Sequence, residues 1–503
     1  MDSVVDADLV RARQTLVTSP KTGEDMMTIL SRQLHMVALL CVAMRVLAGV
    51  SHAAQTTPEH NHPNIVFLMT DDQRWDAMGC MGNRVIQTPQ MDRLASDGVL
   101  FTNCFVTTSI CCVSRASVLT GQHARRHGVS GLGEDNNCFR KTLSAESMAQ
   151  TYPALLRKVG YSTGFVGKWG IGHRKPLPVD QFDYWRGFDG QGSYFDTKGD
   201  TTKEHLTARM GKQAAEFITQ SAKANKPFCL SVSFKAPHAW RSSGRVWTEW
   251  DRKYADLYEG KPMPVGKTAT PEMYEKLHPI LKRSFGGPDG KKWVNDREEL
   301  DFQLRGYYRL ITGVDAALGT IRNALKDLGI AENTIIIFTS DNGHLFGDHG
   351  LHGKWVMYEE SIRVPLIIYD PRLPKSLQSS RRAEMVLNID MAPTILEMAG
   401  LPIPNDVQGR SLTAVLRKTA KSWRSEFFYE HAFRADGNLA HVEGIRTHRW
   451  KYTRYVNTDP VFEELFDLEQ DPHEENNLAH DPAYKPQRDK LHGMLIDRKK
   501  GAQ

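Results

Sequence analysis

Residues 64–72 of this 503-residue chain, NIVFLMTDD, decide its fold class. A continuous apolar run that ends in turn-forming residues is typical of a strand buried on both faces of a sheet. Similar apolar runs lie at residues 228–234, 334–338 and 364–369. Helical patterns lie between or beside them at residues 152–159, 206–222 and 308–328. Strands that alternate with helices predict an α/β fold, with a mostly parallel central sheet covered by helices on both faces.

The chain outside this alternation changes character. We predict three parts: an N-terminal extension with a signal peptide at 1–54, the main α/β domain at 55–410, and a smaller C-terminal subdomain at 411–503. Residues 446–452 and 464–468 alternate polar and apolar side chains, which indicates an α+β subdomain with an antiparallel sheet and a terminal helix. Residues 241–300 have little periodicity and predict an insertion of loops and short helices.

The N-terminal extension has the layout of a secretory signal peptide. A run of nine apolar residues at 36–44 continues beyond Arg45 and is followed by small residues at 51–54. This run is too short and too broken to span a bilayer. Translation could start at Met26 or Met27, and a disordered tail with a chance apolar patch is the alternative. We expect an exported protein, periplasmic or secreted, with no membrane span in the mature chain.

The composition is that of an ordinary globular protein. Hydrophobic residues make up 40% and charged residues 24% of the chain, which excludes a disordered, collagen-like or coiled-coil protein. A net charge of +5 is small for this length, and we expect no nucleic-acid partner. Seven cysteines are too few for a disulfide scaffold, although two of them, Cys111 and Cys112, are adjacent.

Two acidic pairs follow predicted strands. Asp71-Asp72 follows the first strand, and Asp341-Asn342 lies just beyond residues 334–338. In open parallel sheets, ligands bind outside the carboxyl ends of the strands. If these strands are neighbours, three carboxylates and one amide oxygen converge, a set that suits Ca²⁺ or Mg²⁺ better than Zn²⁺. The alternative is that each pair only caps a helix or a turn.

The adjacent cysteines open the segment 111–115, Cys-Cys-Val-Ser-Arg. The residues after Arg115 can start a helix with Ser114 as its N-cap, and a helix N-terminus favours bound anions. A cysteine and an arginine four residues apart could hold an oxyanion there. From the residues alone, Cys111 could be a thiolate nucleophile, a disulfide partner or a buried thiol.

Together with Leu119-Thr120-Gly121, this segment resembles the sulfatase signature, Cys-x-Pro-Ser-Arg followed by Leu-Thr-Gly. Six further blocks resemble segments of the family in the same order: 64–72, 160–169, 236–238, 340–343, 350–366 and 464–478. The chain is therefore identified as a member of the formylglycine-dependent, arylsulfatase-like enzymes of the alkaline-phosphatase-like superfamily. The resemblance covers nearly the whole chain beyond the N-terminal extension.

The resemblance implies a sulfuric ester hydrolase that cleaves a sulfate monoester of a carbohydrate or an aryl alcohol. A formylglycine-generating maturation enzyme would oxidise Cys111, and the hydrated aldehyde would attack sulfur. The implied catalytic residues are Cys111, Arg115, Lys168, His173, His238 and Lys354. The implied ligands of a calcium ion, preferred over Mg²⁺, are Asp71, Asp72, Cys111 as formylglycine, Asp341 and Asn342.

The sequence departs from the family pattern at two positions. Val113 replaces the usual proline, which bears on recognition by the maturation enzyme. Gly170 stands where many sulfatases have the histidine of Lys-Trp-His, and His173 is the expected replacement.

Three other interpretations remain at this point. A phosphodiesterase or phosphonate monoester hydrolase of the same superfamily is the alternative enzyme. A sulfated-glycan binding protein whose Cys111 stays a thiol is the non-enzymatic one. The composition around His344, His349 and His352 would also fit zinc, but for His344 and His352 we favour a structural role in a glycine- and histidine-rich loop.

Overall fold

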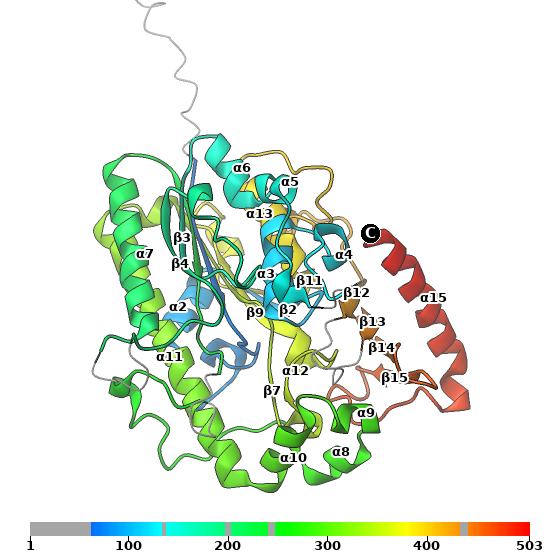
Figure 1. Ribbon diagram of the computed structural model, residues 1–503. Helices are drawn as coiled ribbons and strands as arrows, with labels where there is room; N and C mark the ends of the chain where they lie inside the picture. Colours follow the sequence, from blue (N-terminus) through cyan, green and yellow to red (C-terminus); the bar gives the residue numbers. More distant parts are fainter. Residues whose placement is uncertain (1–61, 133–136, 197–202, 240–246, 433–440) are drawn as a thin grey trace, which may run out of the picture. The chain divides into compact units, whose positions relative to one another are not determined.

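The structure is a computed structural model that describes residues 62–132, 137–196, 203–239, 247–432 and 441–503 (Figure 1). The predicted signal peptide lies outside the described residues. Residues 62–503 form one compact unit. The domain boundary placed at residue 410 stays a prediction.

A nine-stranded sheet forms the centre of this unit, and the mostly parallel α/β fold is confirmed. The strand order is β10 (Ser380–Arg382), β2 (Val99–Phe105), β9 (Arg363–Tyr369), β6 (Thr334–Ser340), β1 (Asn64–Thr70), β5 (Phe228–Ser233), β3 (Ser162–Lys168) and β4 (Tyr184–Phe188), with β11 (Val386–Leu387) beside β2. Strand β9 runs antiparallel to both of its neighbours, and all other pairs are parallel. The four strands expected from apolar runs are β1, β5, β6 and β9.

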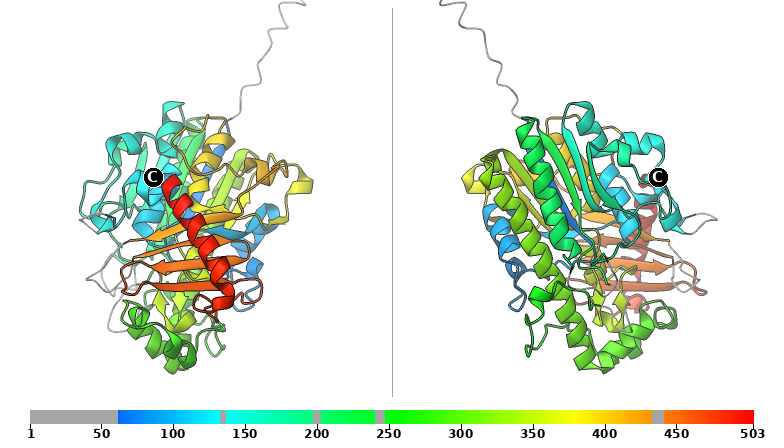
Figure 2. Two further views of the ribbon diagram at one scale, coloured as in Figure 1. Left: turned by 90° about the vertical axis from the view of Figure 1, so that its right-hand side faces the viewer. Right: turned by 60° about the vertical axis from the view of Figure 1, so that its left-hand side comes forward.

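Helices cover both faces of the sheet (Figure 1). Side chains alternate along a strand, so Ile65 and Phe67 of β1 enter one core while Val66 and Leu68 enter the other. The first core is closed by α3 (Cys111–Thr120), α6 (Tyr152–Lys158) and α13 (Met391–Met398). The second is closed by α2 (Pro89–Asp97), α7 (Leu206–Lys223) and α11 (Arg297–Asp327), and Figure 2 shows α7 and α11 side by side over this face.

Helix α11 begins earlier than the sequence predicts. The predicted start at residue 308 is wrong, because the helix begins at Arg297 after Asp296, whose side chain accepts the N–H of Glu299. Polar Glu299 and Gln303 are buried and hydrogen-bonded to each other at 2.7 Å, which hides the helical period of the first turns. The predicted insertion contains the short helices α8 (Pro271–Lys276), α9 (Pro279–Lys282) and α10 (Gly287–Asn295).

The C-terminal part contains the predicted antiparallel sheet. Its strands are β12 (Glu426–His431), β13 (Val442–Thr447), β14 (Trp450–Tyr455) and β15 (Phe462–Asp467). Helix α15 (Lys485–Gly501) lies across this sheet and buries Leu491 and Leu495 against it (Figure 2).

Short elements complete the described chain: α4 (Ala124–His127), α5 (Ala145–Ala149), α12 (Glu359–Ile362), α14 (Thr413–Leu416), β7 (Leu345–Phe346) and β8 (His352–Gly353). Within the described ranges, no helix combines the length and the apolar character needed to cross a bilayer.

Candidate active site

The two acidic pairs meet at one edge of the sheet because β1 and β6 are parallel neighbours. The backbone N–H of Asp341 donates to the carbonyl of Thr70 at 3.0 Å, and the N–H of Asp72 donates to Asp341 Oδ1 at 3.1 Å. Asn342 Nδ2 donates to Asp72 Oδ1 at 2.6 Å. The structure thus brings together Asp71, Asp72, Asp341 and Asn342.

The backbone of Asp72 is in the left-handed region, with φ of 69°. This conformation is uncommon for a residue with a side chain and persists only where the surroundings hold it. Here the Tyr307 hydroxyl donates to the Asp72 carbonyl at 2.8 Å, while the Asp72 N–H is held by Asp341. The strained turn aims the carboxylate of Asp72 at the same space as that of Asp71.

The corner formed by the two acidic pairs contains oxygen atoms that could bind a cation. Asp71 Oδ1 and Asn342 Oδ1 are buried and accept no hydrogen bond from the described residues. One carboxylate oxygen each from Asp71 and Asp72 and one ring nitrogen of His238 lie within 4.8 Å of one another. Buried acceptors are nearly always satisfied in proteins, so unsatisfied ones that share a corner fit a bound cation. An oxygen-rich set matches Ca²⁺ or Mg²⁺.

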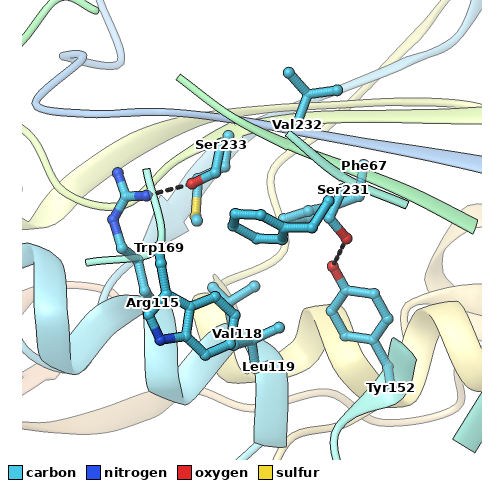
Figure 3. A pocket seen from close by; sticks show the side chains of 11 residues that line it. Phe67, Arg115, Val118, Leu119, Tyr152, Trp169, Ser231, Val232 and Ser233 are labelled. Carbon is cyan, nitrogen blue, oxygen red and sulfur yellow. Dashed lines mark hydrogen bonds between the residues drawn. The ribbon is translucent and has the colours of Figure 1, made fainter. Parts of the chain in front are cut away.

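Arg115 is fixed below this corner. Its Nε donates to Asp341 Oδ2 at 2.9 Å, and its Nη1 donates to the Lys168 carbonyl at 2.8 Å and to Ser233 Oγ. The side chain borders a small cavity of about 20 Å³ (Figure 3). The apolar lining of this cavity includes Phe67, Val118, Leu119 and Trp169. The hydrogen bonds of Nε and Nη1, together with ion pairs of Nη2 to Asp341 and Asp71, hold the guanidinium in place.

Two buried lysines face the aspartates. Lys168 Nζ lies 2.5 Å from Asp71 Oδ2, and Lys354 Nζ donates to Asp72 Oδ1. Burial opposes the charged form of Lys168, but the Asp71 carboxylate outweighs it and the pKa of Lys168 is raised. We call Asp71, Asp72, Asp341, Arg115, Lys168 and Lys354 the active-site cluster. Its three negative and three positive charges cancel, so a divalent cation would leave it positive and attractive to an anion.

Helix α3 begins at Cys111, not after Arg115. The prediction that Ser114 caps this helix is wrong, because Ile110 is the N-cap and its carbonyl accepts the N–H of Ser114. Ser114 Oγ instead accepts a hydrogen bond from Asn388 Nδ2 at 2.9 Å. The first turn of α3 therefore carries Cys111, and its N–H groups favour negative charge beside that residue.

The two adjacent cysteines face different surroundings. Burial raises the pKa of the Cys111 thiol, although Lys168 and Lys354 oppose this effect. An unmodified thiol here is therefore not a ready thiolate. Cys112 turns away, and its Sγ lies 3.0 Å from the Sγ of Cys138.

The two histidines predicted to be catalytic lie in different places. His238 Nε2 lies 3.7 Å from Asp72 Oδ2, beside the cluster. His173 is nearly half exposed and its Nδ1 lies 3.3 Å from Asp189 Oδ2. Among the described residues, no hydrogen bond or ion pair joins His173 to the active-site cluster.

Comparisons with known proteins identify the family of this chain. Residues 63–401 match the family model described as Sulfatase, and residues 347–501 match the one described as N-sulphoglucosamine sulphohydrolase, C-terminal. The chain belongs to the sulfatase family. This sulfatase is thus an enzyme of the class that the sequence predicts.

Its relatives cover nearly the whole chain. An N-acetylglucosamine-6-O-sulfatase of Bacteroides thetaiotaomicron is 32% identical over 518 residues, which span 90% of each chain. A solved structure of a protein in complex with its substrate D-glucosamine-2-N,6-O-disulfate has a TM-score of 0.69 and 28% identity, covering 88% of this chain and 98% of the other. Phosphonate monoester hydrolase of Agrobacterium radiobacter has a TM-score of 0.72, covering 88% and 96%, but at 24% identity it shows the fold alone.

Three further residues lie beside the active-site cluster, and the sequence did not predict them as part of a sulfatase site. Gln191 Oε1 accepts a hydrogen bond from Lys168 at 2.7 Å. Lys235 is buried just after β5, where burial and nearby Lys168 lower its pKa to about 7. His344 Nδ1 lies 3.5 Å from Asp72 Oδ2, although its loop suggested only a structural role. The closeness of Lys235 to the predicted His238 is the one signal that could have pointed to it.

Proposed function

We propose that this protein is a calcium-dependent sulfatase that uses formylglycine made from Cys111 to hydrolyse a sulfate monoester of a carbohydrate. The observation that carries the proposal is the active-site cluster, three buried carboxylates and three buried cations beside the first residue of α3. A sulfate monoester is an anion, and its hydrolysis needs a nucleophile, charge neutralisation and a proton for the leaving oxygen.

The residues fit both groups that the family implies. Asp71, Asp72, Asp341 and Asn342 would hold Ca²⁺, with residue 111 completing the set. Bound calcium would supply positive charge for the sulfate oxygens. Formylglycine at residue 111 would supply a hydrated aldehyde, whose hydroxyl can act as the nucleophile. The unmodified thiol is less suited to this role, because burial disfavours its thiolate form.

The basic side chains divide into two sides of the site. Arg115 and Lys168 lie on Asp71, whereas Lys354 and His238 lie on Asp72. We assign the first pair to the non-bridging sulfate oxygens, because both are fixed by several bonds before substrate arrives. We assign the second pair to the leaving oxygen. Lys354, whose ammonium is stabilised by Asp72, would hold the proton that the alcohol needs, and His238, whose pKa burial lowers to about 3, would lie beside it as a neutral imidazole.

The relatives suggest the sugar. One curated relative is named an N-acetylglucosamine-6-O-sulfatase, and one solved neighbour holds a disulfated glucosamine. We therefore propose a sulfated amino sugar as the first substrate to test, with nitrophenyl sulfate as a general probe.

The decisive experiment combines mass and activity. Protein produced together with a formylglycine-generating enzyme is digested, and the peptide that contains residue 111 is examined by mass spectrometry. We expect formylglycine at this position and faster hydrolysis of nitrophenyl sulfate than of nitrophenyl phosphate or a phosphonate monoester. Cys111→Ala should abolish activity, while Cys112→Ala serves as the matched control. A thiol at residue 111 in active protein, or a preference for phosphorus esters, would contradict the proposal.

We also propose that the protein is exported. Support comes from the apolar run and the small residues at 51–54. N-terminal sequencing of the protein recovered outside the cytoplasm of its own host should give a mature start near Ala54. An uncleaved chain found only in the cytoplasmic fraction would contradict export.

A further inference from the structure

The ammonium of Lys168 has a second partner that the mechanism above does not use. Its Nζ donates to Asp71 Oδ2 at 2.5 Å and to Gln191 Oε1 at 2.7 Å. Lys168 ends β3, while Gln191 follows β4 on the next loop. A lysine ammonium has three N–H donors, so these two acceptors fix the direction of the third.

The loop that carries Gln191 is built to hold it in place. Gly190 and Gly192 on either side have φ of 63° and 61°, in the left-handed region that glycine adopts without strain. A Cβ at Gly192 would lie 2.4 Å from the ring of Phe188, so that position accepts no side chain without movement. The two glycines thus turn the chain tightly around Gln191.

His173 supports this loop. Asp189 Oδ1 accepts the N–H of Gly190 at 2.6 Å, and Asp189 Oδ2 accepts the N–H of Arg174 at 2.9 Å and faces His173 Nδ1 at 3.3 Å. These contacts tie the loop after β3 to the loop after β4. The structure therefore places His173 behind the loop of Gln191, as a positioning residue rather than a catalytic one.

Space beside Lys168 is kept open by Gly170. This glycine has φ of 73°, and a Cβ on it would lie 2.9 Å from Arg115 Cδ and 3.4 Å from Lys168 Cε. A histidine at residue 170 would displace the arginine. The polar group that reaches Lys168 comes instead from Gln191.

We propose that Gln191 is a further catalytic residue, whose Oε1 orients the ammonium of Lys168 and whose Nε2 donates a hydrogen bond to a non-bridging sulfate oxygen. The proposal rests on the proposed sulfatase function. Gln191 is half-buried, and no described residue accepts a hydrogen bond from its Nε2. Because the amide is planar, fixing Oε1 on Lys168 also fixes Nε2 beside it. The sulfate would then meet two adjacent donors, one charged and one neutral.

Substitutions of Gln191 separate the donor from the acceptor. Gln191→Ala removes both and should lower kcat/KM by about tenfold to a hundredfold. Gln191→Glu keeps an acceptor for Lys168 but replaces the donor with a negative charge that faces the sulfate. It should therefore be slower than Gln191→Ala. Gln470→Glu, an exposed glutamine after β15, is the matched control and should equal the wild type.

Residue 111 must be checked by mass spectrometry in each variant, so that maturation does not differ between them. Gln191→Glu with full activity would overturn the proposal, because an acceptor alone would then suffice. Full activity of Gln191→Ala would overturn it as well. His173→Ala should lower activity less than either substitution, since it only loosens the loop.

A binding measurement keeps the proposal apart from the enzymatic function. Inorganic sulfate should raise the Tm of the calcium-loaded wild type and of Gln470→Glu, but not that of Gln191→Glu. If sulfate raises the Tm of Gln191→Glu equally, the proposal fails whatever the activity. If the wild type shows the Gln191-dependent shift but hydrolyses no sulfate ester, the proposed function fails and the anion contact stands.

Discussion

The active-site cluster can be compared with a second buried cluster of charges, the junction cluster, formed by Glu359, Arg446, Lys451 and Glu474. Lys451 Nζ lies 2.8 Å from Glu359 Oε1 and 2.6 Å from Glu474 Oε1, and Arg446 Nε lies 3.1 Å from Glu359. The junction cluster joins α12 to β13, β14 and the turn after β15. Both clusters are buried and dense in charge.

The two clusters differ in whether their buried acceptor oxygens all have a partner. In the junction cluster both oxygens of Glu474 have a partner: Oε1 forms an ion pair with Lys451 at 2.6 Å, although without hydrogen-bond geometry, and Oε2 accepts the N–H of Glu359 at 2.9 Å. In the active-site cluster Lys168 and Arg115 both contact Oδ2 of Asp71, and its Oδ1 has neither an ion pair nor a hydrogen-bond partner among the described residues. Asn342 Oδ1 nearby likewise accepts no hydrogen bond from them. Burial and dense charge are therefore common to both clusters, whereas a carboxylate oxygen with neither an ion pair nor a hydrogen bond is found in the active-site cluster and not in the junction cluster, as far as the described residues go.

The largest expected effect is on catalysis, from Asp71→Asn. This change keeps the shape but removes one charge from the acidic corner proposed to bind calcium, and it should lower kcat/KM by roughly a thousandfold or more. The free energy of unfolding should fall as well, because buried Arg115 and Lys168 lose an anionic partner, so activity is measured where the variant remains folded. The exposed Asp327→Asn is the control. Activity within tenfold of the wild type would remove the distinction between the two clusters.

A substitution in the junction cluster should lower stability and leave kcat nearly unchanged. Lys451→Met leaves Glu359 and Glu474 buried with one cation fewer, and it should lower the free energy of unfolding by about 3–5 kcal/mol. Denaturant unfolding measures this, with the exposed Lys485→Met as control. Below the unfolding transition kcat should stay near that of the wild type. A specific loss of kcat without loss of stability would give the junction cluster a catalytic role.

Calcium should stabilise only through the unsatisfied oxygens. At a concentration a hundredfold above its Kd, a ligand that binds only the folded state stabilises by about 2.7 kcal/mol. We expect calcium to raise the Tm of the wild type and of Lys451→Met, and EDTA to reverse this. Asp71→Asn should lose most of the rise. An equal rise in all three proteins would place the ion elsewhere.

The smallest expected effect is a pH dependence in the junction cluster. Burial, against the attraction of Lys451 and helped by repulsion from Glu359, raises the pKa of Glu474 to about 7 from 4.5. The folded state then binds more protons than the unfolded one between these values, so this residue's stabilisation is present below pH 4.5 and is lost as pH rises towards 7.

Glu474→Gln should remove that dependence. The free energy of unfolding of the wild type, measured relative to this variant, should fall by about 1–3 kcal/mol between pH 4.5 and 7. The exposed Glu469→Gln should follow the wild type. A difference that rises with pH would mean that Lys451 dominates and that Glu474 is ionised throughout.

Much of the fold could be predicted from the sequence, because the patterns that indicate its strands are local. The apolar run of β1 and the polar alternation of β13 to β15 report burial directly, and the acidic pairs could be placed because they end buried strands. The start of α11 was hidden because Glu299 and Gln303 satisfy each other inside the protein, which no local pattern reveals.

The site was predicted less completely than the fold. Gln191 contacts Lys168, which lies 23 residues earlier in the chain, because two glycines with left-handed backbone turn the loop around it. No sequence motif indicates this separation or the direction of the Gln191 side chain. His173 was chosen because it is near Gly170 in the sequence, but the chain between them turns it outward to Asp189. Nearness along the chain predicts side-chain direction only inside regular helices and strands.

The bond from Arg115 to residue 168 goes to a main-chain carbonyl, not to a side chain. No amino-acid exchange at residue 168 can delete that carbonyl, so the guanidinium keeps this anchor through any drift in the identity of its neighbour. This anchor of Arg115 is thus insulated from mutation of residue 168. A lineage that alters the lysine would inherit an arginine still in its place, and it could explore a new ester specificity one residue at a time.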